Sequence, residues 1–259
     1  MKRWAVPLVA LMPWAVLAQP AVEYRIRPAA DTTIYGQQDG STGFDATADG
    51  SGANIWTSVL ASGTTRRALL RFDLSAIPPG SQVQAVRLEV FEIRARDEHV
   101  VRMHRVLAAW GEGASNGGDA GIGAPAQAGD ATWSHRFWPN ALWASRGGDF
   151  SAAASAALLI GFGPALYTWA STPQLVADVQ AWLGQPASNH GWMLIGDDLG
   201  LMNAKRFGSR ENSSDAGRPT LVVTAGPPVL PLAADIPLPP WALAMVAASL
   251  GFALWRRQR

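Results

Sequence analysis

Apolar and polar side chains alternate along two neighbouring segments of the chain, residues 66–72 and 82–93. A period of two places successive side chains on opposite faces of a β-strand. In the first segment Leu69 makes the second face partly apolar, which predicts a strand buried on much of both sides. The turn at residues 77–80, with two prolines and a glycine, separates the segments. The pattern therefore predicts two core strands joined by one turn.

The second segment divides its residues between a predicted core face and a predicted solvent face. Val90 and Ile93 fall on the apolar face, whereas Glu92 falls on the polar face. The apolar period slips between Ala85 and Leu88, which indicates a β-bulge.

Shorter alternating segments occur on both sides of this pair, at residues 21–27, 54–60, 99–110, 158–169, 193–195 and 218–224. One stretch, Thr172–Leu183, instead has an apolar stripe with helical spacing. Thr172 can cap this helix, Pro173 takes its first position and Gly184 closes it. Residues 21–225 are therefore expected to form one all-β domain, a jelly-roll-like β-sandwich with one short α-helix.

The first residues of the chain have the pattern of an export signal. Lys2 and Arg3 precede an apolar run, and Ala18 precedes an expected cleavage before Gln19. This arrangement predicts a secretory signal peptide over residues 1–18. A retained transmembrane helix is the alternative, which the short run and Pro13 disfavour.

The last residues combine a proline motif, an apolar run and a basic end. Residues 226–237 form a Pro-rich spacer that is expected to be extended. Residues 238–259 begin with an apolar run of about 18 residues, just enough to cross a hydrocarbon core of ~30 Å. The residues that carry the pattern are Ile236, Pro237, Pro239, Pro240, Trp241, Arg256, Arg257 and Arg259. They predict a C-terminal transmembrane helix whose basic end stays on the cytoplasmic side.

This tripartite end resembles the PEP-CTERM and IPTL-type sorting signals of Gram-negative bacteria, although it contains no Pro-Glu-Pro. The resemblance implies that an exosortase-like membrane protease cuts near the motif. It also implies an exported protein of the cell envelope, cell surface or extracellular matrix. A plain membrane anchor is the alternative.

The terminal segments change the reading of the charge. Five of the 21 Lys and Arg residues lie in them, whereas all 20 Asp and Glu residues lie between them, so the exported part carries a net charge of about −4. Such a domain has no electrostatic footprint for nucleic-acid binding. The chain contains no cysteine, so we expect its core alone to stabilise the exported domain.

Several segments, taken in order, resemble the DNRLRE-domain family, which comprises secreted β-sandwich modules related to a family of carbohydrate-binding modules. They are residues 31–35, 66–91, 106–113, 130–150, 189–192 and 205–212. The resemblance implies a non-catalytic module that binds a polysaccharide. A structural or adhesive protein with protein partners is the alternative. An enzyme is the least favoured reading, because we find no nucleophile elbow, zinc-binding helix motif or phosphate-binding loop.

An aromatic segment supplies the first candidate site. Trp133, Trp138 and Trp143 lie close together in a long predicted loop, together with two phenylalanines. Exposed rings on a loop can stack on sugar rings, whereas buried rings would form a plug over one end of the sandwich. The sequence leaves both readings open and favours the plug.

Charged residues supply two further candidates. Lys205, Arg206 and Arg210 are candidates for gripping an anionic polysaccharide, with a surface charge ladder as the alternative. The loop at residues 36–52 carries three aspartates, and these weak calcium candidates are Asp39, Asp45 and Asp49. Because their spacing fits no known calcium motif, a solvated loop is favoured and we expect no cofactor other than a structural Ca²⁺.

Overall fold

A computed structural model describes residues 20–228, of which residues 20–227 belong to one compact unit. The predicted signal peptide with its cleavage site at Ala18 and Gln19 lies outside the described residues, as does the predicted sorting or anchor segment from residue 236. Within residues 20–228, no helix is long and apolar enough to cross a membrane.

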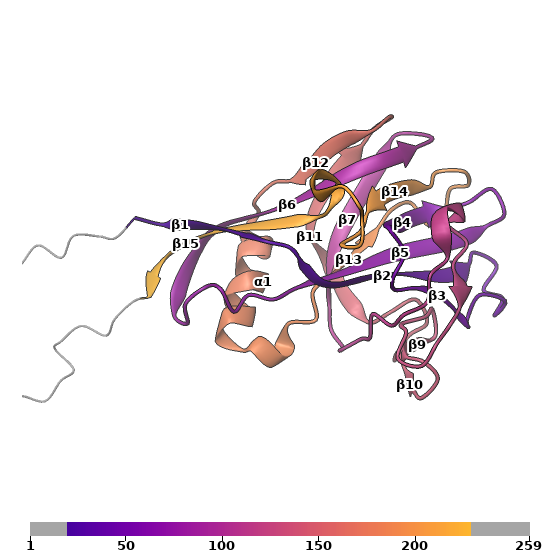
Figure 1. Cartoon of the computed structure of the whole chain (residues 1–259), viewed down its shortest axis with the longest axis horizontal. Helices are drawn as coiled ribbons and strands as arrows, with labels where there is room; N and C mark the ends of the chain where they lie inside the picture. The colour runs from indigo at the N-terminus through magenta and orange to yellow at the C-terminus, as the bar shows by residue number, and fades with distance from the viewer. Residues whose placement is uncertain (1–19, 229–259) are drawn as a thin grey trace, which may run out of the picture. The chain divides into compact units, whose positions relative to one another are not determined.

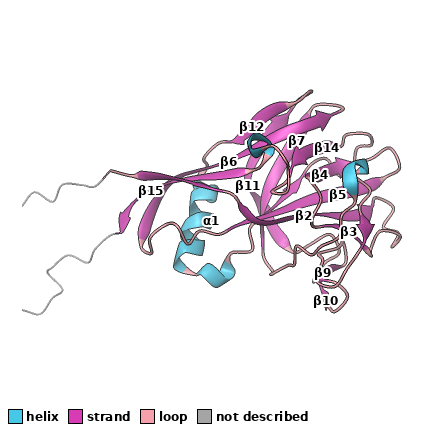
Figure 2. Cartoon of the chain, in the orientation of Figure 1, coloured by secondary structure: helices cyan, strands magenta, loops and turns pink. Residues whose placement is uncertain are grey.

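Strands dominate the described chain, which confirms the predicted all-β class (Figure 2). One set of strands contains β1 (Val22–Ile26), β15 (Thr220–Pro228), β6 (Ser81–Ala95), β14 (Lys205–Gly208) and β4 (Asn54–Val59), with β12 (Ala165–Trp169) paired to β6. The ladder continues from β4 through β5 (Thr64–Phe72), β13 (Trp192–Ile195), β7 (His99–Val106) and β11 (Phe150–Ile160). β15 thus extends beyond the predicted end of the domain at residue 225. The finer prediction of a jelly-roll topology stays a prediction.

The remaining strands are attached to this ladder or to one another (Figure 1). β2 (Pro28–Gln37) pairs with β5, and β3 (Thr47–Asp49) joins β2 to β8 (Ala124–Pro125). A separate hairpin pairs β9 (His135–Phe137) with β10 (Ala141–Leu142). Three short 3₁₀ turns are η1 (Gly118–Ala120), η2 (Pro186–Ser188) and η3 (Asp215–Gly217).

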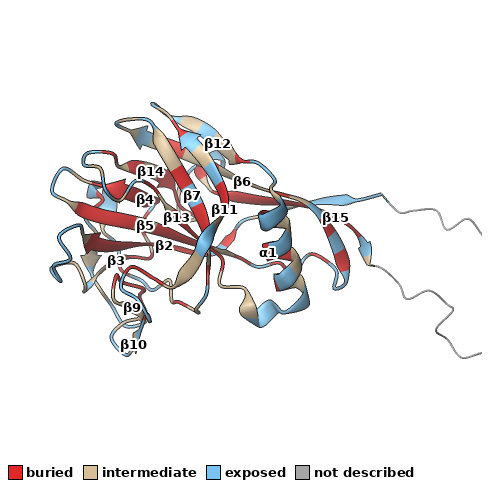
Figure 3. Ribbon diagram, turned by 180° about the vertical axis from the view of Figure 1, so that it is seen from behind, coloured by how far each residue is buried: buried red, intermediate tan, exposed pale blue. Residues whose placement is uncertain are grey.

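Two apolar clusters lie on opposite faces of β5. Leu70 belongs to the larger cluster, which also takes residues from β4, β6, β7, β12, β14 and β15. Leu69 belongs to the smaller cluster, which the long segment after β7 covers. The prediction that this strand is buried on both faces is therefore confirmed, and β5 and β2 are buried along most of their length (Figure 3).

Among residues 20–228 the one α-helix is α1 (Pro173–Gly184), which packs against β6 and β11. Its start follows from the sequence, because the Thr172 hydroxyl accepts a hydrogen bond from the Leu175 amide at 3.0 Å and Pro173 needs no donor partner. Leu175, Val179 and Trp182 are buried. The predicted helix and its apolar stripe are confirmed.

Strand β6 departs from the prediction near its end. Glu92 is fully buried and follows Val86, Leu88 and Val90 on the core face, whereas Ile93 is only partly buried. The buried set changes parity between Val83 and Val86, earlier than the predicted bulge. After this change the period of two continues, so Glu92 stays on the buried face of Leu88 and Val90. The prediction that Glu92 faces solvent is therefore wrong.

Candidate functional site

Three neighbouring strands bring a tryptophan and two arginines into one row. Trp56 on β4 lies directly opposite Arg206 on β14, and Arg206 lies directly opposite Arg94 on β6. Directly opposed residues on antiparallel strands have Cβ atoms about 5 Å apart, so their side chains interact. The residues that alternate with this row, Ile55 and Phe207, are in the core. The row therefore lies on the outer face of the sheet.

The Trp56 ring is fixed between two guanidinium groups. The Arg66 Cζ lies 5.0 Å from the ring centroid and the Arg206 Cζ lies 5.3 Å from it. Both distances are within the range of a cation–π interaction. Arg206 is fixed in turn by Asp119, whose Oδ1 accepts a hydrogen bond from Nη2 at 2.6 Å. The aromatic face and the nearest charge are thus held in place without a ligand.

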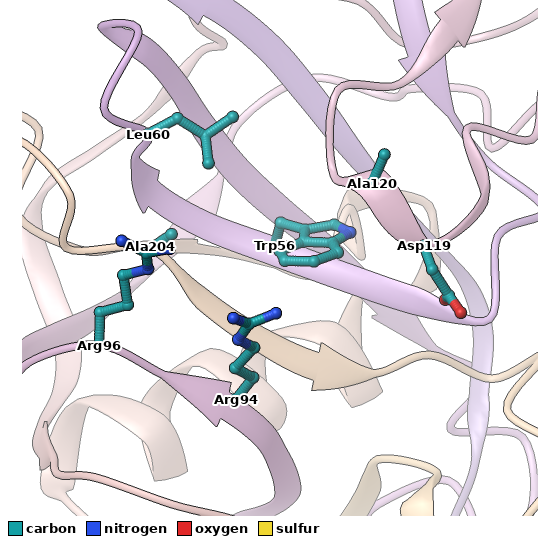
Figure 4. Close-up of a pocket in the computed structure, with 7 residues that line it drawn as sticks. All are labelled: Trp56, Leu60, Arg94, Arg96, Asp119, Ala120 and Ala204. Carbon is teal, nitrogen blue, oxygen red and sulfur yellow. The ribbon is translucent and has the colours of Figure 1, made fainter.

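A pocket of about 250 Å³ opens beside this ring (Figure 4). Its lining residues are Trp56, Leu60, Arg94, Arg96, Asp119, Ala120 and Ala204. The Arg94 guanidinium points toward the Trp56 ring, while Arg96 and Asp119 lie at opposite ends of the pocket (Figure 4). Arg94 and Arg96 are exposed. The pocket therefore has an aromatic wall and a positive end.

Several hydrogen-bond donors around the pocket are unused. Within the described part of the chain, Trp56 Nε1 and Arg206 Nε are buried atoms without an acceptor. No hydrogen bond or ion pair within residues 20–228 holds the Arg94 or Arg96 side chain. The two buried donors are out of reach of a ligand, whereas the exposed guanidiniums of Arg94 and Arg96 suit a ligand that carries oxygen acceptors. An acidic sugar carries such acceptors.

Arg66 supports the ring from the buried side. Its side chain is fully buried, and Nη1 donates to the Gly121 carbonyl at 3.2 Å, just after the turn that carries Asp119. Burial lowers the pKa of Arg66 to about 10. Its Nε and Nη2 have no acceptor among residues 20–228. Arg66 therefore holds Trp56 and the neighbouring loop at a cost in stability.

A second charged cluster lies just past the end of strand β14. Arg210 makes two hydrogen bonds to the Glu112 carboxylate, from Nε at 2.5 Å and from Nη2 at 2.8 Å. The Arg210 amide donates to Asp31 Oδ2 at 2.7 Å. Burial, followed by the nearby charge of Glu211, raises the pKa of Asp31 well above its ordinary value. Arg210 is thus paired with carboxylates of the protein itself, and its role in gripping a ligand stays a prediction.

The same cluster is the place in the described chain where a cation could bind. Oxygen atoms of Asp31, Glu112 and Glu211 lie within 4.8 Å of one another. Carboxylate oxygens are the ligands that calcium prefers. The Arg210 guanidinium already neutralises part of this charge, so the geometry also stands as an ion-pair network without metal.

The three loop aspartates do not form a calcium site. Asp39 is exposed and accepts from the Ser41 amide, while Asp45 pairs with Arg146 at 2.5 Å. Asp49 is buried, and its oxygens accept from the Gly117 amide at 2.9 Å and the Tyr35 hydroxyl at 3.2 Å. Each carboxylate is used by a different part of the protein, so the calcium prediction for this loop is wrong.

The aromatic segment is mainly a plug. The Trp133 and Trp143 side chains are only 9% and 5% exposed and belong to the smaller apolar cluster. Trp143 Nε1 donates to the Thr132 carbonyl at 2.9 Å. Trp138 is half-buried and packs edge-to-face on His135. Because two of the three rings have no open face, the stacking platform predicted for them does not exist.

Lys205 is also absent from the surface. Its side chain is fully buried and contacts Asp97. Of the predicted basic residues, Arg206 alone contacts the Trp56 ring of the pocket.

The sequence analysis did not select Trp56, Arg94 or Arg96 as site residues, although the alternation of side chains contained a signal for Trp56. Trp56 alternates with Ile55 and residue 57, so a large aromatic ring falls on the face opposite the core.

No protein-family model matches this chain, and a search of curated proteins finds no matching sequence. The resemblance to DNRLRE domains therefore stays a prediction.

Proposed function

We propose that this protein is an exported, non-catalytic module that binds an acidic polysaccharide through the pocket beside Trp56. The observation that carries the proposal is the row of Trp56, Arg206 and Arg94, with Arg96 nearby. A guanidinium can bind a carboxylate or sulfate with two parallel hydrogen bonds. Trp56 is only 7% exposed, so it can add a small apolar contact from the pocket wall rather than an open stacking face. The pocket volume of about 250 Å³ fits one or two sugar units rather than a long enclosed chain.

The position of the pocket supports this function. The exported part is mildly acidic overall, so a local group of arginines gives a positive spot that distinguishes acidic chains from neutral ones. The pocket also lies on an outer sheet face, where a polymer can pass without its ends entering the protein. We further propose that residues 1–18 direct export and that residues 236–259 act as a sorting signal or an anchor at the envelope of a Gram-negative bacterium.

Isothermal titration of the exported chain tests the proposal. The ligands are a uronic-acid oligosaccharide, a sulfated oligosaccharide and a neutral oligosaccharide of equal length. We expect binding to the acidic ligands that weakens as salt is added, because exposed charge pairs are screened. Preference for the neutral oligosaccharide, or no binding to any, would refute it.

A structural or adhesive role with protein partners is the alternative. The loop between β13 and β14 exposes three large apolar side chains, Leu199, Leu201 and Met202. Exposed apolar groups close together suit a protein surface better than a sugar. Failure of all three oligosaccharides to bind would favour this role.

A further inference from the structure

Lysine is almost absent from this protein. The chain has 21 Lys and Arg residues, and only Lys2 and Lys205 are lysines. Lys2 lies in the predicted signal peptide, so the exported domain has a single lysine among arginines. That lysine is fully buried on β14. Arginine is the usual choice for a buried ion pair, whereas the lysine amine can lose its proton and act as a nucleophile. The choice of lysine here therefore indicates a role that arginine cannot fill.

The Lys205 amine lies against one carboxyl group. Its Nζ is 3.0 Å from Asp97 Oδ1 and also contacts the main-chain carbonyl of Asp97. His99 Nδ1 holds the same Oδ1 at 3.1 Å, and His99 Nε2 is fixed by the Ser58 hydroxyl at 2.8 Å. The Asp97 carboxyl, in the turn between β6 and β7, is thus held in a fixed position beside the amine.

A second carboxyl group is buried nearby. Glu92 on β6 is fully buried and lies opposite Phe207, two residues along β14 from Lys205. Neither of its carboxylate oxygens has a hydrogen-bond partner within residues 20–228. Burial raises the pKa of Glu92 to about 7, although the charge of Lys205 opposes this. A carboxyl group of this kind both accepts and returns a proton near neutral pH.

We propose that Lys205 and Asp97 join in an intramolecular isopeptide bond, with Glu92 carrying protons between them. A bond forms between Nζ and Cγ of Asp97, and one carbon–oxygen bond of the Asp97 carboxyl breaks. The departing oxygen leaves as water and takes two of the three ammonium protons, which Glu92 transfers. No electron is gained or lost, so the reaction needs no co-reactant. The fold holds the two groups in contact, which replaces the activation that an amide bond otherwise requires.

The bond would fill a structural need of this chain. The protein has no cysteine, so its exported domain has no disulfide. An amide between Lys205 and Asp97 would join positions 108 residues apart and tie β14 to the β6–β7 turn. It would also remove the buried ammonium of Lys205, which is costly to desolvate.

Intact-mass measurement of the purified exported chain tests the proposal. We expect a mass lower than the sequence mass by one water molecule, and a peptide in which Lys205 is joined to Asp97. Lys205→Arg keeps the charge but cannot form the amide, and Glu92→Gln cannot carry the proton. Each variant should have the mass calculated from its own sequence, with no loss of water. The full sequence mass in wild-type protein would overturn the proposal.

A second measurement does not depend on the folding of a variant. The wild-type protein is unfolded in guanidinium chloride and treated with an amine-acylating reagent. Because Lys205 is the one lysine of the exported chain, an isopeptide bond leaves the N-terminal amine as the one acylated position. Acylation of Lys205 would overturn the proposal. It would do so even if the protein has lost one water, because the water would then have been lost at Asp97 without a bond to Lys205.

Discussion

Replacement of Arg66 by methionine separates the stability of the domain from its function. Arg66 is fully buried under Trp56, and methionine keeps an unbranched apolar side chain in the same space. The substitution removes a buried charge, one cation–π contact and the hydrogen bond to the Gly121 carbonyl.

The opposing effects are of similar size. The pKa of Arg66 falls from 12.5 to about 10 because of burial, and each pKa unit is about 1.4 kcal/mol, so the buried charge costs about 3.5 kcal/mol. A desolvated cation–π contact contributes about 2 kcal/mol, and a hydrogen bond from a charged group contributes about 1.5 kcal/mol. We therefore expect the free energy of unfolding to change by no more than about 1 kcal/mol.

Ligand binding should respond differently. Without Arg66, neither the inner face of the Trp56 ring nor the loop at Gly121 is held, so the pocket is no longer preorganised. We expect affinity for the acidic oligosaccharide to fall tenfold or more. Urea unfolding and titration calorimetry measure the two quantities on one preparation. A loss of more than about 3 kcal/mol in stability, or unchanged affinity, would refute this reasoning.

Two further predictions concern buried charges. Arg210→Met leaves the carboxylates around it uncompensated, and, allowing for the partial exposure of Arg210, we expect the free energy of unfolding in urea to fall by about 2 kcal/mol. The control variant Arg25→Met replaces a more exposed arginine and should lower it by less than about 1 kcal/mol. Equal losses in the two variants would contradict the account. Burial lowers the pKa of His99 from 6.5, so protonation is disfavoured in the folded state and stability is lost as pH falls below 6.5. Compared with His99→Gln, wild-type protein should lose more stability between pH 7 and pH 5, and parallel curves would show that His99 does not titrate as argued.

Local sequence patterns predicted those features that depend on local structure. The period of two located most strands, Leu69 indicated the double burial of β5, and Thr172 and Pro173 located the start of α1. The prediction for β6 failed near its end, because the local pattern favours apolar Ile93 over Glu92 for the core, whereas the strand, paired with β12 and β14, keeps its period of two through Glu92. Pairing partners far apart in the chain are not encoded in any one window.

The candidate site shows the same limit. Arg206 could be selected as a basic residue beside a strand, but its neighbours Trp56 and Arg94 come from strands far away in the chain. Conversely, Trp133 and Trp143 form a dense aromatic group in sequence, and packing against the smaller apolar cluster buries them. Residue type predicted the chemistry of the site, whereas the arrangement of the sheet determines which residues meet there.

The central claim is that the arginines beside Trp56 bind an acidic polysaccharide, and titration of a matched pair of variants tests it most directly. Arg94→Gln with Arg96→Gln removes two charges from the pocket, whereas Arg102→Gln removes an exposed charge from β7, on the other part of the sheet. A charged hydrogen bond contributes about 1.5–3 kcal/mol, so the account predicts at least tenfold weaker binding of a uronic-acid oligosaccharide to the double variant and unchanged binding to Arg102→Gln. Equal affinity of the double variant and the wild-type protein would contradict it.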